Sequence, residues 1–242
     1  MGTGLTVAAI QMDCVLQHVA ENLSVAHGLL DDAADRGAQV AVLPELFSTG
    51  YALYKDALLH ADRIDGHLAK WLAAQARTLK LHIVGSMVER GEMALYLTTM
   101  LVGPQGLCIT HRRRRLSPTE DLYYTPGEVT KAATIDRLTV GVLGGEDLLA
   151  PRQVSTLRDQ GAQLLCSGAA LTDATRYGEA VVRAAREGGF YHVAANRIGR
   201  EADFGFCGGS RIVAPDGTEL GSVADDVQGV ALATVPLPAL RG

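Results

Sequence analysis

Short apolar runs alternate along the chain with longer segments in which apolar residues recur at helical spacing. In residues 19–36 apolar side chains return every three or four positions, and Gly37 then supplies a C-cap. Residues 39–43 form an aliphatic run that Pro44 ends, which is typical of a buried strand. The alternation predicts an α/β protein with mixed sheets, because helices between strands act as crossover connections.

No Pro/Ser-rich linker and no internal repeat interrupts this pattern, so it predicts one domain over residues 1–242. The turn at 103–106 is expected to join a hairpin, and two more strands are expected on either side of the Pro-Asp-Gly turn at 215–217. The predicted strands are 5–10, 39–43, 81–88, 95–102, 107–111, 138–143, 163–166, 191–195, 211–214 and 230–235, and the predicted helices are 19–36, 68–79, 152–160 and 175–187.

The composition is that of an ordinary soluble protein, with 48% hydrophobic and 20% charged residues. The net charge of −5 argues against a general nucleic-acid binder, which normally has a strong basic excess. We expect no signal peptide and no membrane association, because no apolar run approaches the roughly 18–20 residues that span a bilayer. Four widely spaced cysteines without a CxxC pair indicate reduced thiols and a cytoplasmic location.

The sequence predicts neither a metal site nor a cofactor site. The histidines lack the spacing of metal ligands, and neither of the glycine-rich phosphate-binding patterns, GxxxxGK[ST] and GxGxxG, occurs.

Short motifs in a fixed order resemble those of the nitrilase superfamily, the carbon–nitrogen hydrolases. They are Ala8-Ala9-Ile10-Gln11, Leu43-Pro44-Glu45-Leu46-Phe47, Tyr124-Thr125-Pro126-Gly127, Arg186-Glu187, Ala194-Ala195-Asn196-Arg197 and Phe206-Cys207-Gly208-Gly209-Ser210. Each motif is short, but together they cover nearly the full length of the chain. The resemblance implies a nitrilase-like α-β-β-α sandwich, with two mixed β-sheets between helical layers, and a homodimer that pairs through helical faces.

Members of that family hydrolyse amides, nitriles or carbamoyl groups with a glutamate, a lysine and a cysteine, usually beside a second glutamate. The thiolate attacks the substrate carbon, the glutamate moves protons, and the lysine stabilises the developing oxyanion. The resemblance places the first glutamate at Glu45 and the second at Glu120. It places the lysine at Arg113 and the cysteine at Gly145, so both of these positions depart from the family pattern.

The departures at Arg113 and Gly145 decide which chemistry we expect. Glycine has no thiol, so a thioester cannot form at position 145. Arginine stabilises negative charge with its forked donors but stays protonated. Two hypotheses follow. One is an enzyme acting on a small amide-like or amine-bearing substrate by cysteine-independent chemistry, with Glu45 as general base. The other is a catalytically inactive pseudoenzyme that binds a small ligand or a partner protein.

The candidate charged residues also have structural interpretations. Glu45 is costly to bury unless it is paired, and an ion pair with Arg113 is the alternative to a catalytic role. Arg113 either holds an anionic group of the substrate or pairs with a glutamate, and Glu120 either joins the site or supports its loop. If residues 111–115 continue a strand, Arg113 and Arg115 face the same side.

Three further residues lie near the expected site. Glu146 stands where the family has an aromatic residue and would add a carboxylate to the substrate pocket, whereas Asp147 is expected to tie the turn. Cys166 ends the strand that follows the strand of Gly145, at the sheet edge where functional loops gather. It would line the site or act as a relocated nucleophile. The alternative is that its thiol is a small buried hydrophobe.

Overall fold

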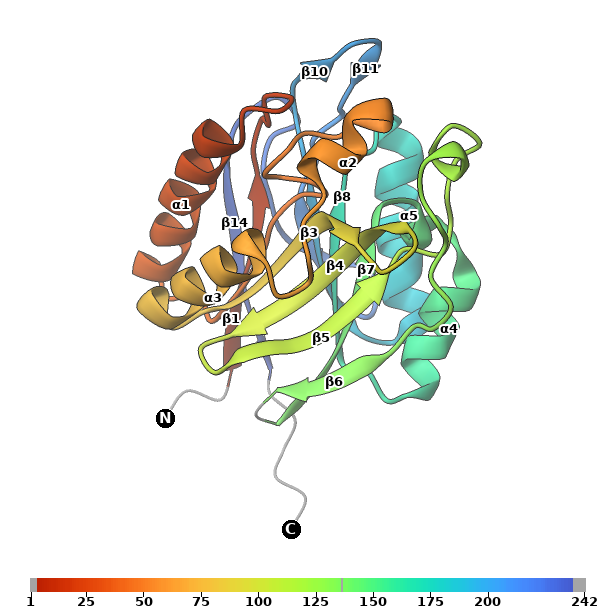
Figure 1. Cartoon of the computed structure of the whole chain (residues 1–242). Helices are drawn as coiled ribbons and strands as arrows, with labels where there is room; N and C mark the ends of the chain where they lie inside the picture. The colour runs from red at the N-terminus through yellow and green to blue at the C-terminus, as the bar shows by residue number, and fades with distance from the viewer. Residues whose placement is uncertain (1–3, 136, 237–242) are drawn as a thin grey trace.

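Two six-stranded β-sheets lie face to face at the centre of the molecule (Figure 1). The computed structural model describes residues 4–135 and 137–236. In spatial order the first sheet consists of β14 (Gly229–Pro236), β1 (Gly4–Gln11), β2 (Val40–Val42), β3 (His82–Arg90), β4 (Leu95–Gly103) and β5 (Gly106–Arg112). The second consists of β13 (Glu219–Ser222), β12 (Arg211–Val213), β9 (Tyr191–Asn196), β8 (Leu164–Ala169), β7 (Leu138–Gly144) and β6 (Ala132–Ile135).

Both sheets are mixed, as predicted. The central strands β1, β2 and β3 run parallel, as do β7, β8 and β9. Their antiparallel neighbours are β14, β4, β12 and β6, whereas the edge strands β5 and β13 pair antiparallel with β4 and β12 and so run in the direction of the central strands. Short loops at the carboxyl ends of parallel strands therefore meet at one edge of each sheet, which is where α/β proteins place their functional groups.

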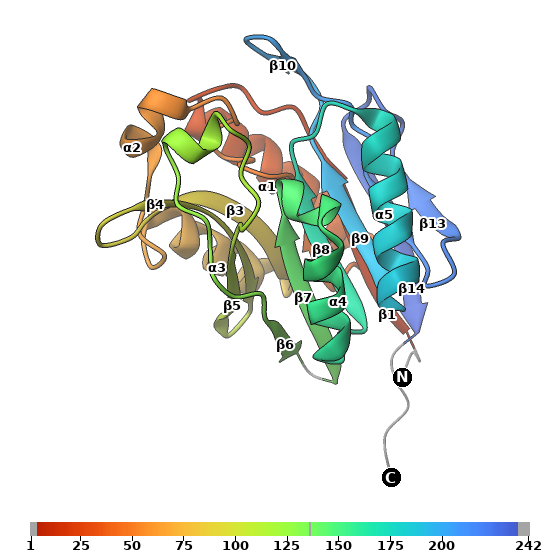
Figure 2. The same cartoon turned by 90° about the vertical axis from the view of Figure 1, so that its right-hand side faces the viewer.

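Helices cover the outer face of each sheet. The first sheet carries α1 (Val19–Asp35) and α3 (His67–Leu79), and the second carries α4 (Pro151–Asp159) and α5 (Ala174–Gly188), as Figure 2 shows. Each helix turns its apolar stripe inward; α1, for example, buries Ala26, Leu30 and Ala33. The expected α-β-β-α sandwich is confirmed.

Three apolar layers hold the sandwich together. The layer between the sheets includes Val7, Val42, Val84, Val140, Val142, Leu164 and Val193, all fully buried. One layer lies between the first sheet and its helices and another between the second sheet and its helices. Each aliphatic side chain buried in this way stabilises the fold by about 1.5–3 kcal/mol. The strands buried on both faces are continuous apolar runs, which explains why sequence pattern alone located them.

The C-terminal part of the second sheet differs from the prediction. The turn at 215–217 joins β12 to β13, a strand that was not predicted, whereas β14 leaves this sheet and pairs along its whole length with β1. The residues of β13 are mostly exposed, and Leu220 is the one large apolar side chain among them, so no hydrophobic alternation marks the strand. The β14–β1 pairing joins the two ends of the chain, and local periodicity contains no information about such a distant partner.

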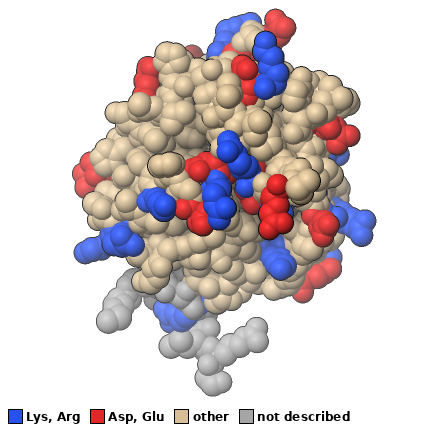
Figure 3. Space-filling view, in the orientation of Figure 1, with Lys and Arg blue, Asp and Glu red and all other residues tan. Residues whose placement is uncertain are grey.

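Among the residues that the structure describes, no helix is both long and apolar enough to cross a bilayer. On the face shown in Figure 3, basic and acidic side chains lie interspersed.

Candidate active site

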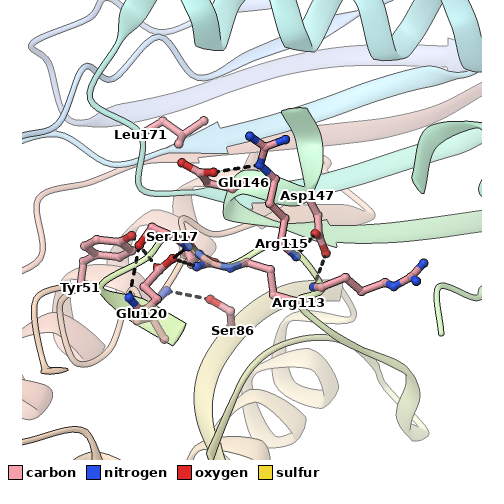
Figure 4. Close-up of polar contacts among 12 residues, drawn as sticks. Tyr51, Ser86, Arg113, Arg115, Ser117, Glu120, Glu146, Asp147 and Leu171 are labelled. Atoms are coloured by element: carbon pink, nitrogen blue, oxygen red, sulfur yellow. Dashed lines mark hydrogen bonds and ion pairs between the residues drawn. The ribbon is translucent and has the colours of Figure 1, made fainter. Parts of the chain in front are cut away.

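Three buried charged side chains meet where loops from both sheets converge. Figure 4 shows two of them, Arg113 and Glu120. Glu45 follows β2, Arg113 follows β5, and Glu120 begins the short 3-10 helix η2 (Glu120–Leu122). Their residues are only 2%, 1% and 1% exposed. The structure therefore brings together the three side chains that the sequence nominated as catalytic.

The guanidinium group of Arg113 connects the two carboxylates. Its Nη1 donates to Oε1 and Oε2 of Glu45 at 3.0 and 3.1 Å, and its Nη2 forms an ion pair with Oε2 of Glu120. One positive charge is thus paired with two negative charges. The cluster as a whole carries one excess negative charge when both carboxyls are ionised. Of the two alternatives for Arg113, the structure shows pairing with glutamates.

Contacts to two strands, β8 and β3, hold the segment of Glu45 in place. Its backbone N–H donates to the carbonyl oxygen of Ala169 at 3.2 Å, which ties the end of β2 to the end of β8 in the other sheet. The next residue, Leu46, has a left-handed φ of +51°, and its N–H donates to Oγ of Ser86 at 2.7 Å. An unfavourable backbone conformation kept by a specific hydrogen bond is common at functional sites.

Glu120 both joins the cluster and supports its loop. Its Oε1 accepts a hydrogen bond from the hydroxyl of Tyr51 at 2.6 Å, and its Oε2 accepts one from the backbone N–H of Ser117 at 2.8 Å. Tyr51 was not among the predicted site residues. It lies in the same segment as Glu45, but nothing in the sequence shows that its hydroxyl reaches a residue 69 positions away.

The two carboxyls that share the guanidinium have pKa values shifted in opposite directions. Burial, reinforced by the charge of Glu120 and opposed by Arg113, raises the pKa of Glu45 to about 7. Burial also disfavours charge on Glu120, but Arg113 and the donors Ser117 and Tyr51 outweigh it and lower the pKa of Glu120. One carboxyl is therefore suited to exchange a proton near neutral pH, whereas the other stays ionised.

Gly145 lies directly against this cluster. It begins the 3-10 helix η3 (Gly145–Leu149) after β7 and has a left-handed φ of +47°. A Cβ atom built at Gly145 would lie 2.5 Å from Nη1 of Arg113 and 2.5 and 2.7 Å from the carboxylate oxygens of Glu45. The Glu45–Arg113 pair thus occupies the space that a side chain at position 145 would need.

Asp147 ties η3 to the end of β5, as predicted. Its carboxylate accepts hydrogen bonds from Nε2 of His111 at 2.7 Å and from the backbone N–H groups of Arg114 and Arg115 at 2.9 and 2.7 Å. The His111–Asp147 contact is completely buried. These bonds hold the segment after Arg113 close to the turn that carries Gly145.

The expectations for Arg115 and Glu146 need correction. Strand β5 ends at Arg112, so the alternation of faces does not continue, and Arg115 is exposed while Arg113 is buried. Arg115 pairs at 3.1 Å with Glu146, whose side chain is 23% exposed. The carboxylate of Glu146 therefore belongs to a surface ion pair beside the cluster.

Cys166 also lies elsewhere than predicted. It is fully buried in the apolar layer between the sheets, paired in register with Val142 and Val193. Burial raises the pKa of its thiol far above the ordinary value, so a thiolate is strongly disfavoured. The alternative role, that of a small hydrophobe, is the one that the packing supports.

Two polar atoms beside the cluster remain free to bind something else. Within the described residues, Nε of Arg113 and the hydroxyl of Tyr124 are buried without a hydrogen-bond partner. Burial, followed by the charge of Glu120, raises the pKa of Tyr124, so its hydroxyl is a donor at neutral pH. Buried polar atoms of this kind are usually satisfied by a ligand or by water.

Across residues 4–135 and 137–236, no group of three or more His, Cys, Asp or Glu side chains could hold a metal ion. The four cysteines are free thiols.

Known proteins with similar sequences and folds cover almost the whole chain. A nitrilase from Pyrococcus abyssi is 30% identical over 239 residues, which is 97% of this chain and 91% of the relative. A 2-oxoglutaramate amidase from Bacillus subtilis is 29% identical over 89% of this chain and 85% of its own length. The crystal structure of an amidase from Nesterenkonia sp. superposes with a TM-score of 0.90 at 25% identity, covering 98% of this chain and 92% of the amidase.

The family model also fits the chain over almost its full length. The model described as carbon-nitrogen hydrolase matches residues 6–242, a range that contains Glu45, Arg113, Glu120 and Gly145. The chain therefore belongs to the carbon–nitrogen hydrolases of the nitrilase superfamily.

Proposed function

We propose that this protein hydrolyses the carbon–nitrogen bond of a small amide-like substrate, with Glu45 as general base and water as nucleophile. The observation that carries the proposal is the carboxyl of Glu45, buried beside Gly145 with its pKa raised to about 7. A base with a pKa near the working pH combines a sufficient ionised fraction with a useful driving force for proton transfer. The family and the names of the relatives support an amidase-like or nitrilase-like activity.

The reaction proceeds without a covalent intermediate. Glu45 takes a proton from water, the oxygen of that water adds to the carbonyl carbon, and negative charge develops on the carbonyl oxygen. The proton then passes from Glu45 to the leaving nitrogen as the carbon–nitrogen bond breaks, which yields a carboxylic acid and an amine. The missing thiol at Gly145 makes this direct route necessary.

Arg113 and Tyr124 supply the donors that this route needs. The guanidinium of Arg113 is permanently charged and suits an oxyanion, because burial in a site of low dielectric strengthens its electrostatic effect. Nε of Arg113 and the hydroxyl of Tyr124 have no partner among the described residues and are available to the substrate. Glu120, held by Tyr51 and Ser117, keeps the guanidinium in position.

A specific observation favours a second candidate function, that of a non-catalytic ligand or partner binder. The Glu45–Arg113 pair fills the space next to Gly145, and Arg113 Nη1 contacts both oxygens of Glu45. In this arrangement Glu45 acts as a base only after a substrate displaces part of that contact. A permanently closed pair would leave the site inert.

Measuring turnover of a mixed panel of substrates distinguishes the hydrolytic function from the binding function. The natural protein, Glu45→Gln and Glu146→Gln are incubated with amides, nitriles, carbamoyl compounds and amino-acid amides, and products are identified by mass spectrometry. Glu146→Gln is the matched control, because Glu146 is a nearby carboxylate in a surface ion pair. We expect product from the natural protein and the control, and at least about 100-fold less from Glu45→Gln, the lower range for loss of a general base.

The remaining outcomes are equally informative. Product that persists in Glu45→Gln removes Glu45 from the mechanism. No product from the natural protein over the whole panel contradicts hydrolysis of these substrate classes and favours the binding function.

A further inference from the structure

A separate cavity of about 420 Å³ lies between the first turns of α1 and α3 and the short helix α2 (Ala57–His60). Figure 1 shows α1 and α3 next to each other, with α2 above α3. Among the described residues that line the cavity, none belongs to the Glu45–Arg113–Glu120 cluster. Its volume lies within the range of about 300–1,000 Å³ that is usual for small-molecule sites.

The walls of this cavity are mainly apolar. Leu23 comes from α1, Leu68 and Trp71 from α3, and Met87 from β3. The indole of Trp71 is half-buried and packs against Phe47, with ring centroids 6.1 Å apart. An indole and a methionine together offer a flat, polarisable surface, which suits a planar apolar group.

A few polar groups also line the cavity. Ser48 lines the cavity and is 1% exposed. The imidazoles of His60 and His67 have no partner in the described part of the chain. A mostly apolar cavity with a small number of available donors and acceptors is the usual form of a specific ligand site.

The charges around the cavity indicate an uncharged ligand. No lysine or arginine is among the described residues that line it, so an anion would lose its hydration without gaining a counter-ion. The one acidic lining residue, Asp62, already accepts hydrogen bonds from the backbone N–H groups of Arg63 and Leu68 at 2.8 and 3.1 Å. Its carboxylate thus caps the start of α3 and is a poor partner for a ligand cation.

We propose that this cavity is a second ligand site, which binds an uncharged, largely apolar small molecule with one hydrogen-bonding group. The apolar body packs on Trp71 and Leu23, and the polar group reaches Ser48 or one of the two imidazoles. This site is distinct from the proposed hydrolytic site and does not depend on it.

The cavity is nevertheless linked to the loop that carries Glu45. Ser48 and Thr49 line the cavity and follow Glu45 in the same loop. The N–H of Thr49 donates to the carbonyl oxygen of Leu46 at 3.1 Å, and Leu46 has the left-handed backbone conformation next to Glu45. A ligand in the cavity would therefore contact the segment that positions the candidate base.

The chain itself carries the reporter for a binding experiment, because Trp71 is its only tryptophan. Benzyl alcohol is the probe, and its charged analogues benzoate and benzylamine are the controls; tryptophan emission and saturation-transfer NMR measure binding. We expect saturable binding of benzyl alcohol, about tenfold tighter than either analogue, because desolvating an unpaired charge is costly. Absence of saturable binding, or equal binding of all three probes, overturns the proposal.

Paired variants locate the binding. Leu23→Phe fills the cavity and should weaken benzyl alcohol binding about tenfold or more, whereas Leu58→Phe should leave it unchanged. Leu58 is on the same side of the molecule but is 57% exposed and outside the cavity lining. Ser48→Ala, which keeps the cavity open, should weaken binding less than Leu23→Phe. Unchanged binding in Leu23→Phe, with an unaltered melting temperature, contradicts the site.

Discussion

At the scale of single residues, the feature that governs this molecule is one guanidinium shared by two buried carboxyls. Removing a charge from water costs several kcal/mol per ion, and breaking a buried pair by deleting one partner typically costs about 3–5 kcal/mol. Arg113, Glu45 and Glu120 therefore depend on one another for their burial. The excess negative charge makes one of the carboxyls easier to protonate, and the structure assigns that role to Glu45.

The pH dependence of hydrolysis should report this assignment. Glu45 is a base only when ionised, so kcat/KM for an amide substrate should rise with pH through an apparent pKa of about 7. Glu146→Gln should keep the same profile. A profile that is flat between about pH 5 and pH 9 would show that ionisation of Glu45 does not limit the reaction.

The raised pKa of Glu45 also makes the stability of the fold depend on pH, but stability should fall with rising pH where activity rises. The pKa of Glu45 is raised from 4.5 in the unfolded reference to about 7 in the folded protein. Protonation of Glu45 therefore contributes to the free energy of unfolding, and this contribution is complete below about pH 4.5. It is lost as the pH rises through about 7.

A side chain at Gly145 should destabilise the protein. Gly145→Ala places a Cβ within 2.5 Å of Glu45 and Arg113 and forces alanine into a φ of +47°, with an expected cost of about 1–3 kcal/mol. The control is Gly28→Ala in α1, where the new Cβ meets nothing within 4 Å and helix propensity favours alanine by about 0.5–1 kcal/mol. Urea unfolding measures both. Equal midpoints for Gly145→Ala and the natural protein would contradict the close packing described for this position.

At the scale of elements, loops at strand ends create the site, and contacts with other elements hold these loops. Glu45 depends on a backbone contact to β8, Arg113 lies one residue beyond β5, and Gly145 opens η3 after β7. The strands were predictable, because their continuous apolar runs record burial on both faces. The contacts between their ends were not, because each joins segments that are distant in the sequence.

The buried carboxylate of Asp147, which ties η3 to the end of β5, gives a prediction at this scale. Asp147→Asn retains the size of the side chain but replaces one acceptor oxygen with a donor that faces His111 or the N–H groups of Arg114 and Arg115. We expect a loss of about 1–3 kcal/mol in unfolding free energy, the usual cost of an unsatisfied buried donor. Amide exchange at Arg114 and Arg115 should accelerate.

The control for Asp147→Asn is the same substitution at an exposed aspartate. Asp159→Asn alters an aspartate whose side chain is 67% exposed and pairs with its neighbour Arg158. This change should alter the free energy of unfolding by less than about 0.5 kcal/mol. If both variants unfold alike, Asp147 does not hold η3 against β5.

At the scale of the whole molecule, the sandwich leaves two outer helical faces, and the family resemblance predicts a homodimer through such a face. The outer side of α5 carries a shallow groove lined by Gly178, Val182, Arg183 and Arg186. Small and aliphatic residues flanked by charges are compatible with a second copy, in which the charged groups form the rim.

Light scattering after size-exclusion chromatography tests this expectation. We expect the natural protein to have the mass of a dimer and Val182→Glu to have that of a monomer, because a carboxylate placed in a close helical contact loses its hydration. Ala74→Glu, on the exposed side of α3, is the control and should remain a dimer. A natural protein that is monomeric at all concentrations would contradict pairing.

The sequence by itself determined the layered α/β fold, the place of each main strand and helix, and the family, because burial periodicity and short motifs are local properties of the chain. It also nominated Glu45, Arg113 and Glu120, which the structure places in contact. Only the tertiary structure decided which charges pair, that Glu146 faces Arg115, and that Cys166 belongs to the core. The physical reason is that pairing and burial depend on segments brought together by folding, whereas residue type and local spacing say only what a side chain is able to do.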